Sequence, residues 1–191
     1  MTIARSSLDK SATSSFCSIS DTTYIFLKFD TTYISSKVFA LIRRKKSSEI
    51  ERIAASCRIV FAVQQKLEAL IEPGISTLEL DQIAEAEIHS LGAIPAFKGY
   101  HSFPYSICAS VNASIVHGFP NEIPLREGDI VSIDVGARLD NYYGDGAFTV
   151  GVGSISAEAQ KLIEGTLACL EFGIDQARPD RRLSDISHAI Q

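Results

Sequence analysis

The chain has 191 residues, which is enough for one domain or slightly more. Its 46% hydrophobic and 21% charged residues are those of an ordinary globular protein. No run approaches the roughly 18 apolar residues of a membrane-spanning helix. Cys17, Cys57, Cys108 and Cys169 are widely spaced without a C-x-x-C pair, which favours a reducing compartment over a disulfide framework.

The net charge of −5 is unevenly distributed. Residues 1–45 carry seven Lys or Arg and three Asp, whereas residues 46–191 carry eleven Lys or Arg and twenty Asp or Glu, a net −9. A body this acidic argues against nucleic acid as the main partner, and it is compatible with a site that gathers cations.

The first 36 residues include fifteen Ser or Thr and no long apolar run. Without an apolar core segment they do not form a signal peptide, and Asp9, Asp21 and Asp30 argue against an organellar transit peptide. We therefore expect residues 1–42 to be a poorly ordered N-terminal extension. The alternative is a short β element around "YIFLKF".

The segments 47–74 and 76–92 predict two amphipathic helices, because their apolar residues recur at spacings of three and four. Hydroxyl residues supply candidate N-caps, either Ser47 or Ser48 for the first helix and either Ser76 or Thr77 for the second. A glycine follows the last periodic residue of each segment and predicts its end.

Strand and helix signals then follow in order along the rest of the chain. The patterns predict a strand at about 105–111, a strand pair at 130–137 and 142–150, a helix at 156–174, and a second helix beginning at 183.

The predicted strand pair carries Asp134 and Asp145, although aspartate is rare in strands. If the turn holds two residues, Asp140 and Asn141, then Asp134 lies opposite Ala147. Asp145 is then its diagonal neighbour on the same face, with backbones roughly 7–8 Å apart. Two carboxylates at this separation can converge on one or two cations, whereas a three-residue turn would break the register.

A hairpin with one buried face and one hydrated polar face explains the same residues without a cation. Gly144 and Gly146 favour a site, because glycine permits a close approach or a bulge beside it. Neighbouring carboxylates also repel each other, which is costly unless a cation compensates.

His117 ends an apolar segment, where it is either a structural residue or a proton donor or ligand facing the same site. Upstream lie Tyr100, His101, Phe103 and Cys108. Aromatic and sulfur-containing side chains suit the lining of an apolar side-chain pocket, and they are equally ordinary core residues.

Taken together, these stretches resemble the type I methionine aminopeptidases from near Ile42 to Gln191. The resemblance rests on "SSEIERIAASCRIV", "FKGYHSFPYSICASVNASIVHGFP", "LREGDIVSIDVGARLDNYYGDGAFTVGVG" and "RLSDISHAIQ". The wider creatinase- and prolidase-like family shares the two aspartates and lacks the "GYHSFPYSICASVN" segment in this form. The resemblance implies an α/β (α+β) pita-bread fold, an antiparallel curved sheet with covering helices, present in part with its second half incomplete.

The implied activity is that of a metalloaminopeptidase that removes the N-terminal methionine from nascent proteins by means of a metal-activated water. The implied cofactors are two divalent ions (Mn, Fe, Co or Zn), with Asp134 binding one ion through both oxygens and Asp145 bridging the pair. By the same resemblance His117 contacts the substrate and supports catalysis.

The resemblance also makes Tyr100, Phe103 and Cys108 walls of a methionine pocket, with His101 beside it. Phe103 stands where the family commonly has a tyrosine. The implied setting is the cytoplasm, with N-terminal Met peptides as substrates, proximity to the ribosome, no nucleic-acid specificity and no membrane. Residues 43–191 would form the aminopeptidase-like domain.

The family completes its site with one histidine and two glutamates that follow the second aspartate, and this chain ends at Gln191 before any of them. We assign His188 to a helix surface or a packing role, and Glu158, Glu164 and Glu171 to the solvent face of the preceding helix. We therefore expect a chain that is impaired alone and able to self-associate through uncovered surface. The alternatives are a non-catalytic peptide-binding or protein-binding module and a degenerate fragment.

Overall fold

The computed structural model describes residues 15–19, 22–26 and 44–191, which divide into two units at residue 50. In the first unit, β1 (Ser15–Ile19) pairs antiparallel with β2 (Thr22–Phe26). The β element considered for "YIFLKF" is therefore present over residues 24–26, while the remainder of that segment lies outside the described residues. The expected domain boundary at residue 42 stays a prediction.

Two helices form at the expected positions, α1 (Ser47–Glu68) and α2 (Thr77–Ser90). Ser76 caps α2 in a reciprocal arrangement with Glu79, as the sequence predicts. Both cap candidates for α1, Ser47 and Ser48, lie inside the helix instead, so it begins one or two residues earlier than expected. No helix among the described residues is long and apolar enough to cross a bilayer.

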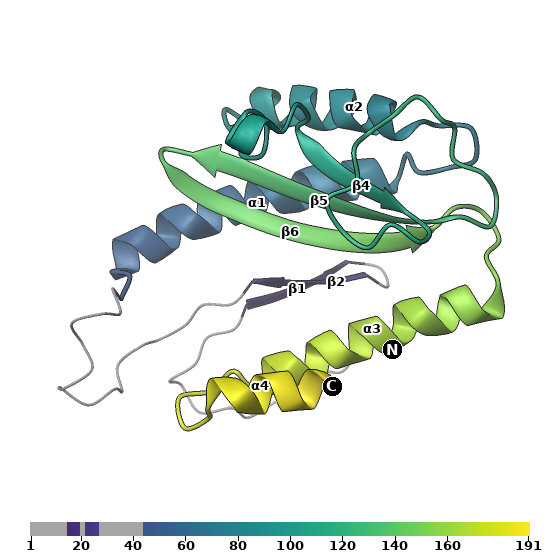
Figure 1. The fold of residues 1–191 in the computed structure, drawn as a ribbon. Helices are drawn as coiled ribbons and strands as arrows, with labels where there is room; N and C mark the ends of the chain where they lie inside the picture. The colour runs from purple at the N-terminus through teal and green to yellow at the C-terminus, as the bar shows by residue number, and fades with distance from the viewer. Residues whose placement is uncertain (1–14, 20–21, 27–43) are drawn as a thin grey trace. The chain divides into compact units, whose positions relative to one another are not determined.

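The sheet of the second unit is antiparallel and centres on β5 (Ile130–Leu139). On one edge β5 pairs with β3 (Ile94–Pro95) and β4 (Ile107–Val111), and on the other edge with β6 (Tyr142–Gly151). The antiparallel sheet with covering helices is therefore confirmed (Figure 1).

The β5–β6 turn holds two residues, Asp140 and Asn141, with φ of 48° and 65°. Positive φ at both central residues matches the twist of a tight hairpin and suits Asp and Asn. Asp134 consequently pairs with Ala147, and the register predicted for a two-residue turn is confirmed.

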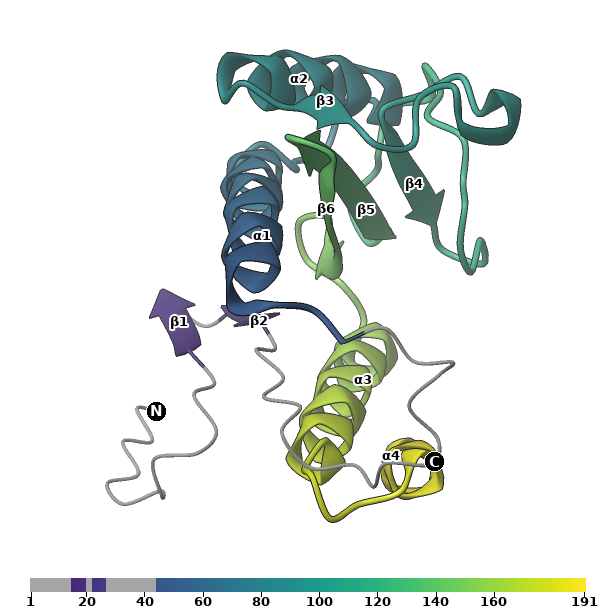
Figure 2. The same ribbon diagram turned by 90° about the vertical axis from the view of Figure 1, so that its left-hand side faces the viewer.

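One face of the sheet forms the core. Val131, Ile133, Val135 and Ala137 alternate along β5 and are all fully buried. Helices α1 and α2 cover this face (Figures 1 and 2), and they contribute Val60, Val63, Leu67, Leu80, Ala84 and Ile88 to the same cluster. The other face of β5 and β6 therefore remains available for polar side chains.

Helix α3 (Ala157–Gln176) follows β6, and α4 (Leu183–Ile190) lies beside it (Figure 2). The two helices meet at Gly173, where an added Cβ would lie 2.8 Å from Ile190. The side chains assigned to helix surfaces are exposed, as predicted: Glu158, Glu164, Glu171 and His188.

Gly144 allows α1 to approach the core face of β6, since a Cβ there would lie 2.5 Å from the backbone carbon of Ser56. We expect Gly144→Ala to destabilise the fold by about 2 kcal/mol, because backbone must move to admit the methyl group. Urea unfolding would measure the change.

Gly165→Ala is the matched control, because a Cβ at that position in α3 meets nothing within 4 Å. It should stabilise the chain by about 0.5–1 kcal/mol through helix propensity. Equal destabilisation by both variants would contradict the close-approach explanation.

Candidate metal and substrate site

The two aspartates lie on the sheet face that points away from the core. Asp134 pairs with Ala147, and Asp145 pairs with Gly136, so the two carboxylates are diagonal neighbours on adjacent strands. On the same face the Ser132 and Thr149 hydroxyls form a hydrogen bond of 2.7 Å. The backbone therefore directs both acidic side chains to one side of the hairpin.

The two carboxyl groups affect each other electrostatically. Burial is the largest effect that raises the pKa of Asp134, to about 6, from its ordinary 3.8. The negative charge of Asp145 and a hydrogen bond between the two side chains raise this pKa further. Such a pair favours either a shared proton or a cation.

The Phe97 ring lies on the aspartate face of β5. A Cβ on Gly136 would lie 2.4 Å from the Phe97 ring, so the ring occupies the space over this glycine on the aspartate face. Gly136 is two residues from Asp134 and is the direct partner of Asp145. Sequence reasoning missed Phe97, and the signal for it was a glycine two residues after the aspartate on the same strand face.

The contacts of Gly118 with β4 position the preceding residue, His117, near Asp134. Gly118 lies against β4, where the Ala109 N–H donates to its carbonyl at 2.9 Å and its own N–H donates to the Ser110 hydroxyl at 3.1 Å. His117 itself has φ of 57°. When protonated, its imidazole lowers the pKa of Asp134, an effect smaller than those of burial and Asp145. The structure therefore brings His117 and Asp134 within electrostatic reach.

Cys108 lies directly across from Asp134 in the β4–β5 ladder and is buried. Burial and the nearby charges of Asp134 and Asp145 raise the pKa of its thiol to about 11. The sulfur is thus a neutral, polarisable surface beside the carboxylates rather than a nucleophile.

The aromatic candidates divide into two groups. The Phe103 ring packs edge-on against Tyr105 and Phe119, with centroid distances of 6.0 and 5.1 Å. In the short 3₁₀ turn η1 (Tyr100–Ser102), the Tyr100 and His101 rings contact each other at 4.3 Å, and Tyr100 is 68% exposed. The printed sequence gave no signal for Tyr105 and Phe119 beyond their aromatic character.

Gly144 and Gly146 serve the opposite face of the hairpin. A Cβ on Gly144 would meet the α1 backbone, and a Cβ on Gly146 would lie 3.1 Å from the Gln64 side chain. The β5–β6 pairing continues through both glycines without a bulge. Close approach is therefore found, but it is the approach of α1 to the core face, so these two glycines do not support a site on the aspartate face as the sequence led us to expect.

The pair suits a hard divalent cation by its chemistry, because two oxygen ligands at close quarters lose their mutual repulsion when a cation binds. The described residues contain no group of three or more His, Cys, Asp or Glu side chains placed to hold a metal. Within the described residues the arrangement is therefore a pair of carboxylates with an imidazole within electrostatic reach.

Residues 51–191 match the profile of metallopeptidase family M24. Methionine aminopeptidase 1 of Bacillus subtilis is 51% identical over 147 residues, which cover 77% of this chain and 59% of that protein. The crystal structure of a methionine aminopeptidase from Rickettsia prowazekii superposes with a TM-score of 0.78 at 34% identity, covering 79% of this chain and 61% of that one.

A prolidase from Pyrococcus furiosus shares the fold, with a TM-score of 0.69 at 23% identity over 76% of this chain and 42% of that one. The pita-bread arrangement expected from the sequence is thus confirmed for the part of the fold that is present. The chain spans about three fifths of the length of the methionine aminopeptidases that it matches, 59% and 61% for two of them.

The raised pKa of Asp134 has a consequence for stability. Folding favours the protonated form of Asp134. The protonated carboxyl therefore makes its full contribution to the free energy of unfolding below the ordinary pKa of 3.8, and this contribution is lost as the pH rises through about 6. We expect Asp134→Asn to unfold with the same free energy as the wild type at pH 4 and to be about 2 kcal/mol more stable at pH 7.

Urea unfolding in metal-free buffer over this pH range would measure the difference. Ser132→Ala on the same face removes a neutral hydrogen bond and serves as the control, with an offset that is equal at every pH. A pH-independent offset for Asp134→Asn would contradict the close carboxylate pair.

Proposed function

Since this chain belongs to metallopeptidase family M24, we propose that it is part of a methionine aminopeptidase that removes the N-terminal methionine of nascent proteins. The observation that carries the proposal is the close pair of Asp134 and Asp145, with Cys108 and His117 beside it. A bare hydrated hairpin face would not bury one of its acids or hold the two within hydrogen-bonding range.

The residues of the chain have separate roles in this proposal. Asp134 and Asp145 are the metal ligands, and divalent ions (Mn, Fe, Co or Zn), when bound, supply Lewis acidity and activate water. In this proposal His117 contacts the substrate near the scissile amide and holds or releases a proton at an imidazole nitrogen. Its position near Asp134 supports this assignment.

The substrate pocket in this proposal is formed by Tyr100, His101, Phe103 and Cys108. Cys108 keeps its proton at neutral pH, so it offers a methionine side chain an apolar sulfur contact. Phe103 belongs to an aromatic cluster, which is a stable wall for an apolar group.

The partners follow from the same assignment. N-terminal Met peptides are the substrates, in the cytoplasm and near the ribosome, without nucleic-acid specificity and without a membrane. The net −9 of residues 46–191 supports a cation-gathering protein rather than a nucleic-acid binder. Large apolar side chains on α3 and α4 support self-association, since Leu162, Phe172 and Leu183 are exposed.

A peptide-binding module without turnover is the second candidate. It is favoured by the donor set of the described residues, which contains no group of three or more metal-binding side chains. Two carboxylates alone hold a divalent cation weakly, and turnover by this family's chemistry requires a firmly held ion.

Calorimetric titration with Mn²⁺ would test the metal assignment. We expect binding with a dissociation constant on the order of 1 mM, as in weak carboxylate sites. Asp134→Asn and Asp145→Asn should each abolish the binding heat, because each removes one of the two charges.

Asp140→Asn is the matched control on the same hairpin, at the turn rather than on the aspartate face, and it should bind Mn²⁺ like the wild type. Unchanged binding by Asp134→Asn would sink the assignment of this carboxylate.

A complementation experiment would test turnover. The chain is mixed with the part of the Bacillus subtilis relative that lies outside the match. With Mn²⁺ present, the mixture should release methionine from a Met-Ala-Ser peptide. His117→Ala should slow release about 100-fold, the usual loss on removing an acid–base group.

Asp134→Asn should stop methionine release altogether. A mixture that binds the peptide without releasing methionine would favour the binding module. Methionine release that persists in Asp134→Asn would contradict the assignment of Asp134 as a metal ligand.

A further inference from the structure

The loop that carries the proposed pocket aromatics is strained. His101 and Ser102 have φ of 46° and 66°, in succession, and Gly99 before them has φ of 84°. Residues with a Cβ avoid this left-handed region, and two adjacent cases cost free energy that the rest of the structure must offset. Inside the loop, the Gly99 N–H donates to Phe103 at 2.7 Å and the Phe103 N–H donates to Tyr100 at 2.9 Å.

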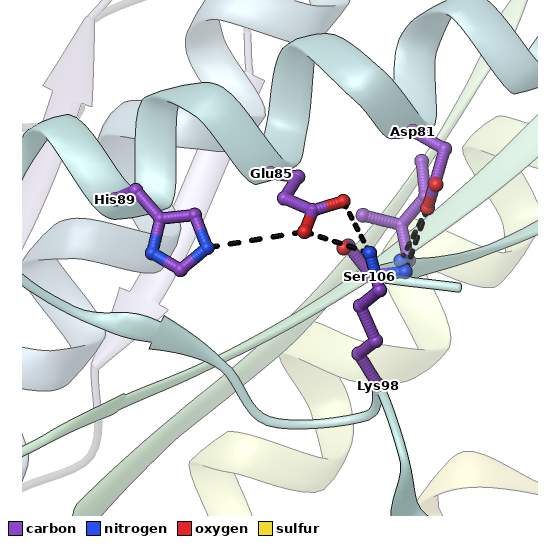
Figure 3. Close-up of polar contacts among 6 residues, drawn as sticks. Asp81, Glu85, His89, Lys98 and Ser106 are labelled. Carbon is purple, nitrogen blue, oxygen red and sulfur yellow. Dashed lines mark hydrogen bonds and ion pairs between the residues drawn. The ribbon is translucent and has the colours of Figure 1, made fainter. Parts of the chain in front are cut away.

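An ion pair ties the start of this loop to α2. The Lys98 ammonium donates to both carboxylate oxygens of Glu85 at 2.7 Å (Figure 3). The Lys98 hydrogen bond is the largest effect that lowers the pKa of Glu85, so this carboxyl stays ionised. His89, one turn further along α2, lies 3.9 Å from the same carboxylate.

A buried carboxylate ties the end of the loop to the same helix. Asp81 accepts the backbone N–H groups of Ser106 at 2.8 Å and Ile107 at 3.0 Å through one oxygen (Figure 3). Asp81 is 5% exposed, so its contacts with β4 exclude water. Because Asp81 and Glu85 are four residues apart, both anchors come from one edge of α2.

We propose that Asp81 and Glu85 are positioning residues, which clamp both ends of the strained loop so that Tyr100, His101 and Phe103 are ordered before substrate arrives. The identity of the ligand rests on the proposed function, whereas the clamp rests on the geometry of the free chain. Pre-ordering of this kind spares a ligand the entropy cost of arranging the loop. Neither anchor touches the reacting atoms in this proposal.

The clamp is separable from fold stability. The side chains of Glu85 and Lys98 are 30% and 45% exposed, and such pairs contribute little to the free energy of unfolding. Glu87 offers a matched control on the same helix, because its carboxylate pairs at 2.5 Å with Lys66 of α1 rather than with Lys98. Glu85→Gln therefore removes the charge that binds Lys98 of the loop, whereas Glu87→Gln removes a charge that binds Lys66 of α1.

Hydrogen exchange of the 191-residue chain would test the clamp. In Glu85→Gln the Gly99 and Phe103 amides should exchange about fivefold faster, with core amides such as those of Ile133 unchanged. The His101 ring protons should lose the shift that the Tyr100 ring imposes at 4.3 Å. In Glu87→Gln the loop amides and ring signals should match the wild type.

Rescue distinguishes positioning from a general loss of charge. Lys98→Met should reproduce Glu85→Gln, Lys98→Arg should keep wild-type exchange, and the Glu85→Gln/Lys98→Met double variant should be no worse than either single variant. Equal loop exchange in Glu85→Gln and Glu87→Gln, or failure of Lys98→Arg to protect the loop, would overturn the proposal.

The second anchor has its own variant. Asp81→Asn should speed exchange at Ser106 and Ile107 about fivefold, because a neutral amide oxygen is a weaker acceptor than a carboxylate. If this buried substitution prevents folding, the Glu85 and Lys98 variants still decide the proposal.

Titration with L-methioninamide separates the clamp from the proposed ligand. The ring signals of His101 and Phe103 should shift in the wild type, with about fivefold weaker binding in Glu85→Gln. Equal affinity in the two would overturn positioning. Absence of any shift in the wild type would overturn the assignment of a methionine pocket. The hydrogen-exchange rates of the loop amides would then be the test of the clamp.

Discussion

The two-residue turn at Asp140 and Asn141 is the constraint on which the rest of the structure depends. Side chains alternate along a strand, so a shift of one residue in the β5–β6 pairing would exchange the two faces of the sheet. With both turn residues at positive φ, Val131 and Ile133 enter the core while Asp134 faces outward. The turn therefore fixes the apolar core and the acidic site at once.

Much of this arrangement is predictable from local chemistry. The Asp-Asn turn, the alternation in "IVSIDV" and the serine cap of α2 are each encoded within a few residues, and the structure agrees with all three. The first helix, predicted to begin after a cap at Ser47 or Ser48, begins at Ser47 itself, because helix ends are the least sharply encoded part of a helix.

What the sequence could not show are the long-range contacts. The partner of Gly144 is α1 and the partner of Gly136 is the Phe97 ring, yet nothing near either glycine names its partner. The sequence does contain one indication of the role of Asp81, because this acid lies beside the apolar residues Leu80 and Ala84 of α2. A buried carboxylate at such a position requires hydrogen-bond donors. Which donors it finds depends on where β4 arrives.

Strain links the site to the fold that holds it. Residues other than glycine with positive φ include His101, Ser102 and His117 on the loops of the proposed site, in addition to the hairpin turn. Each conformation persists only where surrounding contacts determine it, namely the α2 anchors for the first two and the β4 contacts of Gly118 for His117. Two of the three parts of the proposed site thus depend on contacts outside their own loops, whereas the relative placement of the two carboxylates follows from the hairpin register. That difference makes the carboxylate pair the most robust part of the proposed site and the pocket loop the part most sensitive to changes far from the chemistry.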